Sequence, residues 1–255
     1  MQLMRRFFPL AFILCIPFVA CSGEDEPESR EDFCGRWATA TCNDDVVSVC
    51  QASDVDACRL SQERFCLDLV PVMGFVDTRA DACIDAVKAA YADTNLDAKE
   101  LDTVLRLGAP CDRLVRGPRS ATQSCMSRAD CDGPEGYDCV FKGGGAAGSC
   151  QKPIVVQPGR DCSAENAVCT EGFYCNGSNC IEGAGTGEAC MRNEQCGEGF
   201  CGPNNLCSAG LSINASCTRD DECASGLCYS FSASERVCTD RVRLGRTDPL
   251  CENAR

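Results

Sequence analysis

The sequence predicts a small disulfide-rich fold: an N-terminal disulfide-linked α-helical domain, followed by an extended array of four-cysteine repeats with little regular secondary structure. Cysteine accounts for 26 of the 255 residues, against 11 Phe, 4 Tyr and 1 Trp. A chain of this composition depends on covalent cross-links more than on a large apolar interior. The cysteine spacing also changes near residue 112, from wide intervals to tight groups of four. These two spacings define the two regions.

Residues 1–20 have the plan of a secretory signal peptide. Arg5 and Arg6 precede an apolar run of about 13 residues, shorter than the roughly 20 that a membrane-spanning helix needs. The end of the run, Phe18-Val-Ala-Cys21, resembles the bacterial lipobox, with Phe18 standing where Leu is usual. The resemblance implies that Cys21 becomes the lipidated first residue of the mature chain. The alternative is ordinary cleavage near Ala20 and a freely secreted protein.

The cysteine count favours lipidation. Cys15 leaves with the signal peptide and a lipid would occupy Cys21, so 24 cysteines remain for twelve pairs. Residues 21–32 then form an acidic tether with six carboxylates. Loss of the two signal-peptide arginines changes the formal charge from -14 to -16, and this charge repels nucleic acid and anionic membrane surfaces. We therefore expect no nucleic-acid partner, and membrane contact through the lipid anchor.

Residues 33–112 are predicted to form a helical domain that contains seven cysteines. Apolar and small residues recur at helical spacing from Cys34 to Cys42, and again from Cys83 to Tyr91. The first five cysteines are spaced eight residues apart. The cysteines of this domain are Cys34, Cys42, Cys50, Cys58, Cys66, Cys83 and Cys111.

Helix boundaries are marked by capping signals. Thr78 with Asp81, and Asp97 with Glu100, have the residue types and spacing of capping boxes at helix N-termini. Gly108 follows an apolar helical stripe and is a fitting C-terminal stop.

Cysteines eight residues apart on one helix lie about 12 Å apart, whereas bridged Cα atoms lie about 4.4 to 6.8 Å apart. Neighbouring cysteines of this series therefore cannot pair with each other. An antiparallel hairpin of residues 32–42 against 55–70 would match Cys34 with Cys66 and Cys42 with Cys58. Cys111 lies outside any group and is left to pair with the helical region or with Cys251.

Residues 113–255 are predicted to be disulfide-rich repeats at about 125–150, 162–180, 190–207 and 217–238. A unit of roughly 20 to 27 residues is too small to bury a stable core, so its bridges must stabilise it. A glycine precedes the third cysteine of most groups by two or three residues. The grouped cysteines are Cys125, Cys131, Cys139 and Cys150; Cys162, Cys169, Cys175 and Cys180; Cys190, Cys196, Cys201 and Cys207; Cys217, Cys223, Cys228 and Cys238; Cys251 stands alone.

The composition argues against catalysis and against a metal or redox cofactor. The chain has no histidine, the commonest general base and nitrogen ligand. At least four residues separate any two neighbouring cysteines, whereas zinc knuckles, iron-sulfur sites and dithiol redox sites use closer pairs. We therefore expect no enzyme, no cofactor and no metal site.

Three acidic clusters are also read as helix caps or solvated turns, because none has the central glycine and closing glutamate of a calcium loop. These clusters are Asn43-Asp44-Asp45, Asp54-Val-Asp56 and Asp220-Asp221-Glu222.

The last repeat carries a family resemblance. The run Cys217-Thr-Arg-Asp-Asp-Glu-Cys223-Ala-Ser-Gly-Leu-Cys228, closing at Cys238, resembles the start of the Dickkopf N-terminal cysteine-rich domain. Similar four-cysteine units occur in nematode EB modules and in cysteine-rich lipoproteins of myxobacteria and related bacteria. The whole chain is similar to that last group. The resemblance covers about half the chain and implies an architecture, not the receptor antagonism of Dickkopf proteins.

We expect a lipid-anchored cell-envelope or surface protein, on the outer membrane or cell surface, that acts as a non-enzymatic binding or structural module for an unknown protein or envelope ligand. The alternative function is a secreted or tethered inhibitor of a protease or other hydrolase. The candidate contact loops are residues 142–148 and 229–236. Phe200 and Phe231 are candidate anchors, with a place in a small core as the other reading of each.

Overall fold

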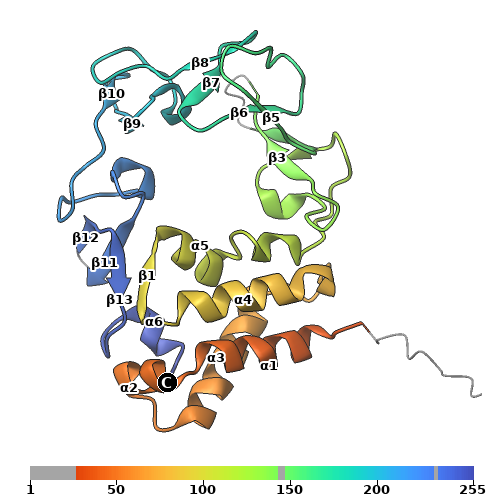
Figure 1. Ribbon diagram of the computed structural model, residues 1–255, viewed down its shortest axis with the longest axis vertical. Helices are drawn as coiled ribbons and strands as arrows, with labels where there is room; N and C mark the ends of the chain where they lie inside the picture. The colour runs from red at the N-terminus through yellow and green to blue at the C-terminus, as the bar shows by residue number, and fades with distance from the viewer. Residues whose placement is uncertain (1–26, 143–146, 233–234) are drawn as a thin grey trace, which may run out of the picture.

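The computed structural model describes residues 27–142, 147–232 and 235–255. The signal peptide, Cys21 and most of the acidic tether lie outside the described residues. Helices form one end of the molecule, and short strands form an arch that rises from it and returns to it (Figure 1). Within those ranges, no helix has the length and apolar character that crossing a bilayer requires.

The first three helices each begin at a polar side chain that accepts a backbone hydrogen bond. Ser29 caps α1 (Arg30–Thr41), Asn43 caps α2 (Asp44–Cys50) and Asp54 caps α3 (Val55–Leu69). Such caps satisfy N–H groups that have no partner inside the helix. Two of the acidic clusters therefore act as helix caps, as expected.

One of the two predicted capping boxes is present. Asp97 and Glu100 form a reciprocal box at the start of α5 (Ala98–Arg106). The prediction for Thr78 and Asp81 is wrong, because the 3₁₀ turn η1 (Asp77–Arg79) leads directly into α4 (Ala80–Ala90), which has no side-chain cap.

The end of α5 also differs in detail from the expectation. Leu107, not Gly108, adopts the left-handed conformation, with φ of 52°. At Gly108, a Cβ atom would clash with the carboxylate of Asp102, so that side chain would have to move.

Two disulfides fasten α1 to α3 with the predicted antiparallel pairing. Cys34 is bonded to Cys66, and Cys42 to Cys58, at Cα separations of 5.4 and 5.9 Å. The remaining cysteines of the helical domain bond Cys83 to Cys111 and Cys50 to Cys251. The two cysteines outside the groups thus both pair with the helical region.

The largest core lies among the helices and includes the C-terminus of the chain. Phe33, Trp37 and Val87 are fully buried in it, together with Val242 and Cys251 from the other end of the sequence. Strand β13 (Arg241–Arg243) pairs antiparallel with β1 (Asn95–Asp97), and the short helix α6 (Pro249–Glu252) packs nearby. The last segment, expected to belong to the repeat region 113–255, therefore completes the helical core.

Between Cys111 and β13 the described residues form eleven short strands, β2 to β12, and four further 3₁₀ turns, η2 to η5. Their bounds are η2 Cys111–Arg113, β2 Ser124–Cys125, η3 Arg128–Asp130, β3 Asp138–Val140, β4 Gly148–Gln151, β5 Ile154–Val156, β6 Ala167–Cys169, β7 Phe173–Cys175, β8 Cys180–Glu182, η4 Asn193–Gln195, β9 Phe200–Cys201, β10 Cys207–Ser208, η5 Asp220–Glu222, β11 Cys228–Ser232 and β12 Glu235–Cys238. All of the pairings among β2 to β12 are antiparallel except that of β5 with β6, which is parallel.

The four cysteine groups share one bonding pattern. In each, the first cysteine bonds to the third and the second to the fourth: Cys125–Cys139 and Cys131–Cys150, Cys162–Cys175 and Cys169–Cys180, Cys190–Cys201 and Cys196–Cys207, Cys217–Cys228 and Cys223–Cys238. We call these groups modules 1 to 4.

The backbone of the modules repeats as well. The residue three positions before the first cysteine has a positive φ and donates its N–H to the carbonyl of the fourth cysteine: Thr122, Gly159, Gly187 and Asn214. The residue six positions before the first cysteine forms a parallel β-pairing with the second cysteine. The pairs are Arg119 with Cys131, Val156 with Cys169, Ala184 with Cys196 and Leu211 with Cys223.

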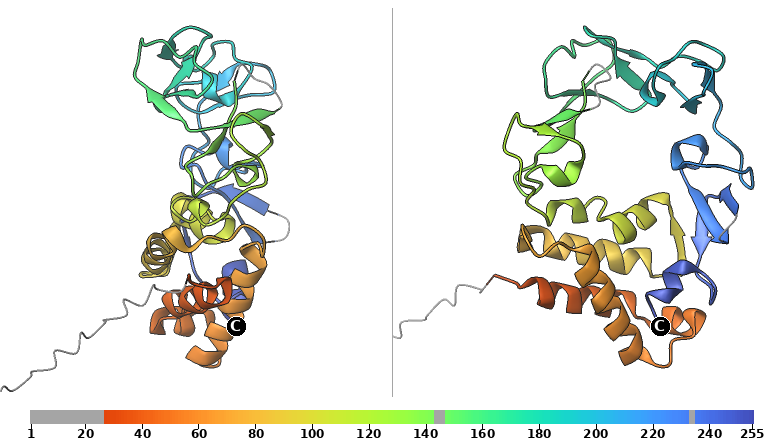
Figure 2. Two further views of the ribbon diagram at one scale, coloured as in Figure 1. Left: turned by 90° about the vertical axis from the view of Figure 1, so that its right-hand side faces the viewer. Right: turned by 180° about the vertical axis from the view of Figure 1, so that it is seen from behind.

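The modules do not continue away from the helices as an extended array. They curve into an arch that leaves the helical domain at Cys111 and rejoins it at β13 (Figures 1 and 2). The physical cause is attachment at both ends, since Cys83 holds Cys111 at the start and Cys50 holds Cys251 at the finish.

Candidate functional site

The strongest candidate binding site is a hollow at the place where module 4 meets the helical domain. It has a volume of about 560 Å³, within the range of small-molecule and side-chain pockets. Helix α5 forms one wall, the start of β11 forms another, and α6 closes the base.

The floor of the hollow is apolar. Leu101, Leu227 and Leu250 are each almost fully buried and belong to the helical core. Leu105 and Tyr229 line the walls above them. An apolar floor in an open hollow suits the burial of an apolar group from a ligand.

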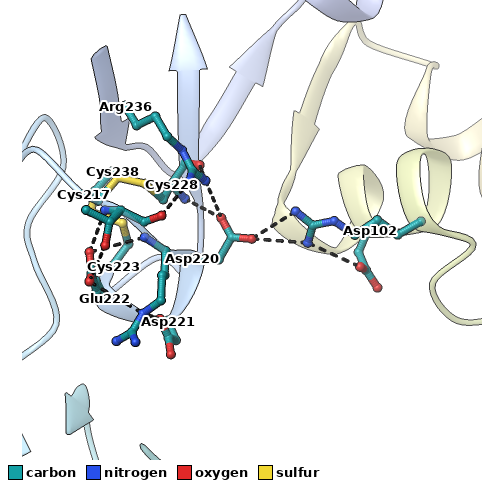
Figure 3. A network of polar contacts seen from close by, with 12 residues as sticks. Asp102, Cys217, Asp220, Asp221, Glu222, Cys223, Cys228, Arg236 and Cys238 are labelled. Atoms are coloured by element: carbon teal, nitrogen blue, oxygen red, sulfur yellow. Dashed lines mark hydrogen bonds and ion pairs between the residues drawn. A yellow bond between two sulfur atoms is a disulfide. The ribbon is translucent and has the colours of Figure 1, made fainter. Parts of the chain in front are cut away.

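Charged groups form the rim, and Asp220 is at their centre. Both terminal nitrogens of Arg106 donate to Oδ2 of Asp220 at 3.2 Å, and Arg236 lies 4.0 Å from Oδ1. Figure 3 shows Asp220 between Arg236 on one side and the helix that carries Asp102 on the other. Because Arg106 also pairs with Asp102 at 3.8 Å, both carboxylates of the rim share one guanidinium.

Asp220 also holds the module together. Its Oδ1 accepts the backbone N–H of Cys228 at 2.9 Å. Asn193 makes the equivalent bond to Cys201 in module 3. The side chain of Asp220 therefore makes one bond within module 4 and others to the helical domain.

A second polar contact lies beside the hollow. The hydroxyl of Tyr229 donates to Oδ1 of Asp248 at 2.9 Å. Burial raises the pKa of the Asp248 carboxyl and also that of the Tyr229 phenol. The contact fastens β11 to the turn before α6.

The candidate loops 142–148 and 229–236 both border hollows. Tyr229 and Arg236 line the one described above, while residues 233–234 lie outside the described residues. Phe141 and Lys142 line a second hollow, of about 610 Å³, which modules 1 and 2 form together with Arg192 and Glu194 of module 3; residues 143–146 lie outside the described residues.

The two candidate aromatic anchors have different outcomes. Phe200 is half-buried in β9 and pairs with Ser208 of β10, but it is not among the residues packed in the small core of module 3. The side chain of Phe231 lies outside the described residues.

All 24 cysteines from Cys34 onward form disulfides. In each module, three sulfur atoms lie within 4.8 Å of one another, because the two bridges stack. Metal ligation by cysteine uses the thiolate, and these sulfurs are bonded to each other instead.

The sequence does not indicate the contact between Arg106 and Asp220. It places Asp220 in an acidic cluster expected to be a helix cap or a solvated turn, whereas the structure shows bonds from Asp220 to Cys228 and Arg106. One signal was available in the sequence: Asn193 and Asp220 both stand eight residues before the third cysteine of their module. Nothing in the sequence indicates that α5 lies opposite module 4.

Comparison with known proteins adds no relative to this description: no protein-family model, curated protein or solved structure matches the chain.

Proposed function

We propose that this chain is an exported, lipid-anchored protein of a bacterial cell envelope or surface, and that it acts as a non-enzymatic binding module. The observation that carries the proposal is the hollow at the joint of module 4, where an apolar floor is surrounded by charged groups that already have partners. A rigid site of this kind loses little conformational entropy when a ligand binds.

The disulfides support both the compartment and the mechanism. Twelve bridges in one chain are typical of proteins that fold in an oxidising environment outside the cytoplasm. They also fix the positions of loops that are too short to be held by a core.

The modules are proposed to be copies of one unit, of the kind found in Dickkopf N-terminal domains, EB modules and cysteine-rich bacterial lipoproteins. Their common bridges and their common backbone hydrogen bonds support this assignment.

Partner capture tests the binding site. Purified protein is used to retain components of a detergent-solubilised cell envelope, and the wild type is compared with Leu105→Arg, which fills the hollow from its wall. Leu60→Arg is the matched control, because Leu60 is exposed on α3 and lies outside the hollow. A partner retained by the wild type and by the control, but lost with Leu105→Arg, supports the proposal. Equal retention by all three proteins contradicts it.

Fatty-acid labelling tests the anchor. Cells that express the wild type or Cys21→Ser are grown with a radioactive fatty acid and then fractionated. We expect label and membrane association in the wild type, and loss of both with Cys21→Ser. A wild type without label would contradict lipidation of Cys21 and would favour the freely secreted protein.

A protease or hydrolase inhibitor is the second candidate function. Phe141 is 47% exposed and lies two residues after Cys139, in the interval that the two bridges of module 1 close. A stapled loop with an exposed aromatic residue suits substrate mimicry. Inhibition of a panel of proteases by the wild type, abolished by Phe141→Ala, would support this function over partner capture at module 4.

A further inference from the structure

We infer that the free edge of strand β5 is a self-association surface, through which two copies of this chain pair their β5 strands antiparallel about Val155. The surface lies in module 2, away from the hollow at module 4, so the inference is independent of the proposed ligand site.

Strand β5 is an exposed, apolar edge strand. Ile154 and Val155 are 58% and 62% exposed. The strand belongs to a two-stranded sheet with β6, and no third strand among the described residues lies on its other side. Exposed apolar edges of this kind are templates for pairing with another strand.

The backbone of β5 alternates between the partner strand and the free edge. The N–H of Ile154 donates to Asn166 at 2.8 Å, and the carbonyl of Val156 accepts from Thr170 at 3.1 Å, so both residues face β6. Val155 therefore directs its N–H and C=O to the free edge, where the carbonyl of Pro153 and the N–H of Gln157 also lie if the chain stays extended. No hydrogen bond to either backbone group of Val155 is present in the described part of the chain.

The groups on this edge complement themselves. In an antiparallel pair centred on Val155, the two copies of Val155 exchange two hydrogen bonds, and residue 157 of each copy faces residue 153 of the other. The N–H of Gln157 can then donate to the carbonyl of Pro153 in the second copy. The reciprocal bond is not needed, because Pro153 has no N–H and the carbonyl of Gln157 already accepts from Arg160 at 3.1 Å.

The side chains fit the same two-fold arrangement. The two Val155 side chains lie opposite each other on one face, and Ile154 of one copy lies beside Val156 of the other. Val168 is in register with Val155 across β6 and is 39% exposed, so it extends the apolar strip on that face, which also lines the second hollow beside Phe141. One surface patch serves both copies, which is the geometry of a closed two-fold dimer.

Two features favour a second copy over an unrelated strand. Self-pairing gives a partner to the carbonyl of Pro153, to both backbone groups of Val155 and to the N–H of Gln157, and it requires no further bond to the carbonyl of Gln157, which already accepts from Arg160. Prolines at 153 and 158 also limit the strand to a short length. The pairing therefore closes after two copies.

Sedimentation velocity over a range of protein concentrations tests the inference. The protein is the full chain with Cys21→Ser, which needs no detergent. We expect a reversible monomer–dimer equilibrium. Val155→Pro removes the N–H of both central hydrogen bonds without removing a bond inside the monomer, and Val155→Lys places two like charges opposite each other. Each should raise the dimer dissociation constant about tenfold or more.

Ile213→Lys is the matched control, because Ile213 is 52% exposed in the segment before module 4 and lies far from β5 in the sequence. It should leave the equilibrium unchanged, and disulfide mapping should show the native bridges in all variants.

Residue-resolved amide exchange gives a second measurement. The amides of Val155 and Gln157 should become protected as the concentration rises, while that of Ile154 is already protected at low concentration. A wild type that stays monomeric up to about millimolar concentration, or a dimer that Val155→Pro does not weaken, overturns the inference.

Discussion

Cys50 and Cys251 are bonded to each other across 201 residues of sequence, with their Cα atoms 5.0 Å apart. The bond joins the end of α2 to α6, and both residues are buried in the helical core. It is the covalent closure of the arch. Every other disulfide spans at most 32 residues, so this bond alone connects the two ends of the module array.

Removing this closure should be costly. The other bridges shorten the loop that it closes to the order of 100 residues, for which the chain-entropy account gives about 4.7 kcal/mol. We expect Cys50→Ala/Cys251→Ala to lose about that free energy of unfolding in denaturant titrations. Cys217→Ala/Cys228→Ala, which opens a loop of 11 residues, should lose about 3 kcal/mol. Equal losses would contradict the closure argument.

The contact of Arg106 with Asp220 should contribute little by itself. The side chain of Arg106 is 64% exposed, and such pairs contribute up to about 1 kcal/mol. Asp220→Ala should cost more than Arg106→Ala, because it also leaves the N–H of Cys228 without its acceptor. A double-mutant cycle of Arg106→Ala with Asp220→Asn, followed by thermal unfolding, measures the pair alone.

At the other end of the arch, Asp112 should matter more. It is only 6% exposed, and Arg128 of module 1 contacts its Oδ2 at 2.6 Å. Asp112→Ala leaves that guanidinium short of a partner, although Asp138 still pairs with Arg128 at 3.3 Å. We expect a loss of about 1.5 to 3 kcal/mol in the free energy of unfolding. The exposed Asp56→Ala on α3 should change it by less than about 0.5 kcal/mol.

The junction between modules 2 and 3 depends on close backbone contact. A Cβ atom on Gly183 would lie 2.2 Å from the backbone nitrogen of Gly197, so the chain must move to accept one. Gly183→Ala should destabilise the protein by about 1 to 3 kcal/mol. Gly185→Ala, where the nearest such contact is 3.7 Å, is the control for thermal unfolding and should cost clearly less.

Acid should destabilise the modules, because it protonates carboxylates that accept backbone hydrogen bonds in the turns of the modules. The N–H of Thr218 lowers the pKa of Glu222, and that of Met126 lowers the pKa of Asp130. A lowered pKa means that folding favours the ionised form, so this stability is complete above the ordinary carboxylate pKa of about 4 and is lost as pH falls through the lower folded value.

Melting temperatures measured from pH 6 to pH 2 check this expectation. Glu222→Gln with Asp130→Asn should flatten the profile over that window, because an amide oxygen accepts the bond at every pH. Module 3 already uses this solution: Gln195 accepts from the N–H of Met191 at 2.6 Å. An unchanged acid profile in the double variant would exclude the capping carboxylates as its source.

The sequence predicted the parts of the fold that local spacing controls. Eight-residue intervals on helices forced Cys34 and Cys42 to find partners on another helix, and antiparallel register then identified Cys66 and Cys58. Local patterns also located the capping box of Asp97 and the caps of α2 and α3.

The sequence did not predict the arch or the hollow at its joint. Both depend on contacts between residues far apart in the chain, such as Gln62 with the carbonyl of Asn253 and Leu96 with Val242. A three-residue strand such as β13 carries no periodicity strong enough to reveal its partner. The predicted capping box at Thr78 failed for a similar reason on a smaller scale, because α4 begins directly after the 3₁₀ turn η1.

Because Val242, Leu250 and Cys251 fill the core of the first domain, the ribosome must make almost the whole chain before that domain has its full set of buried side chains. The earliest helices therefore leave the ribosome unable to reach their final packing.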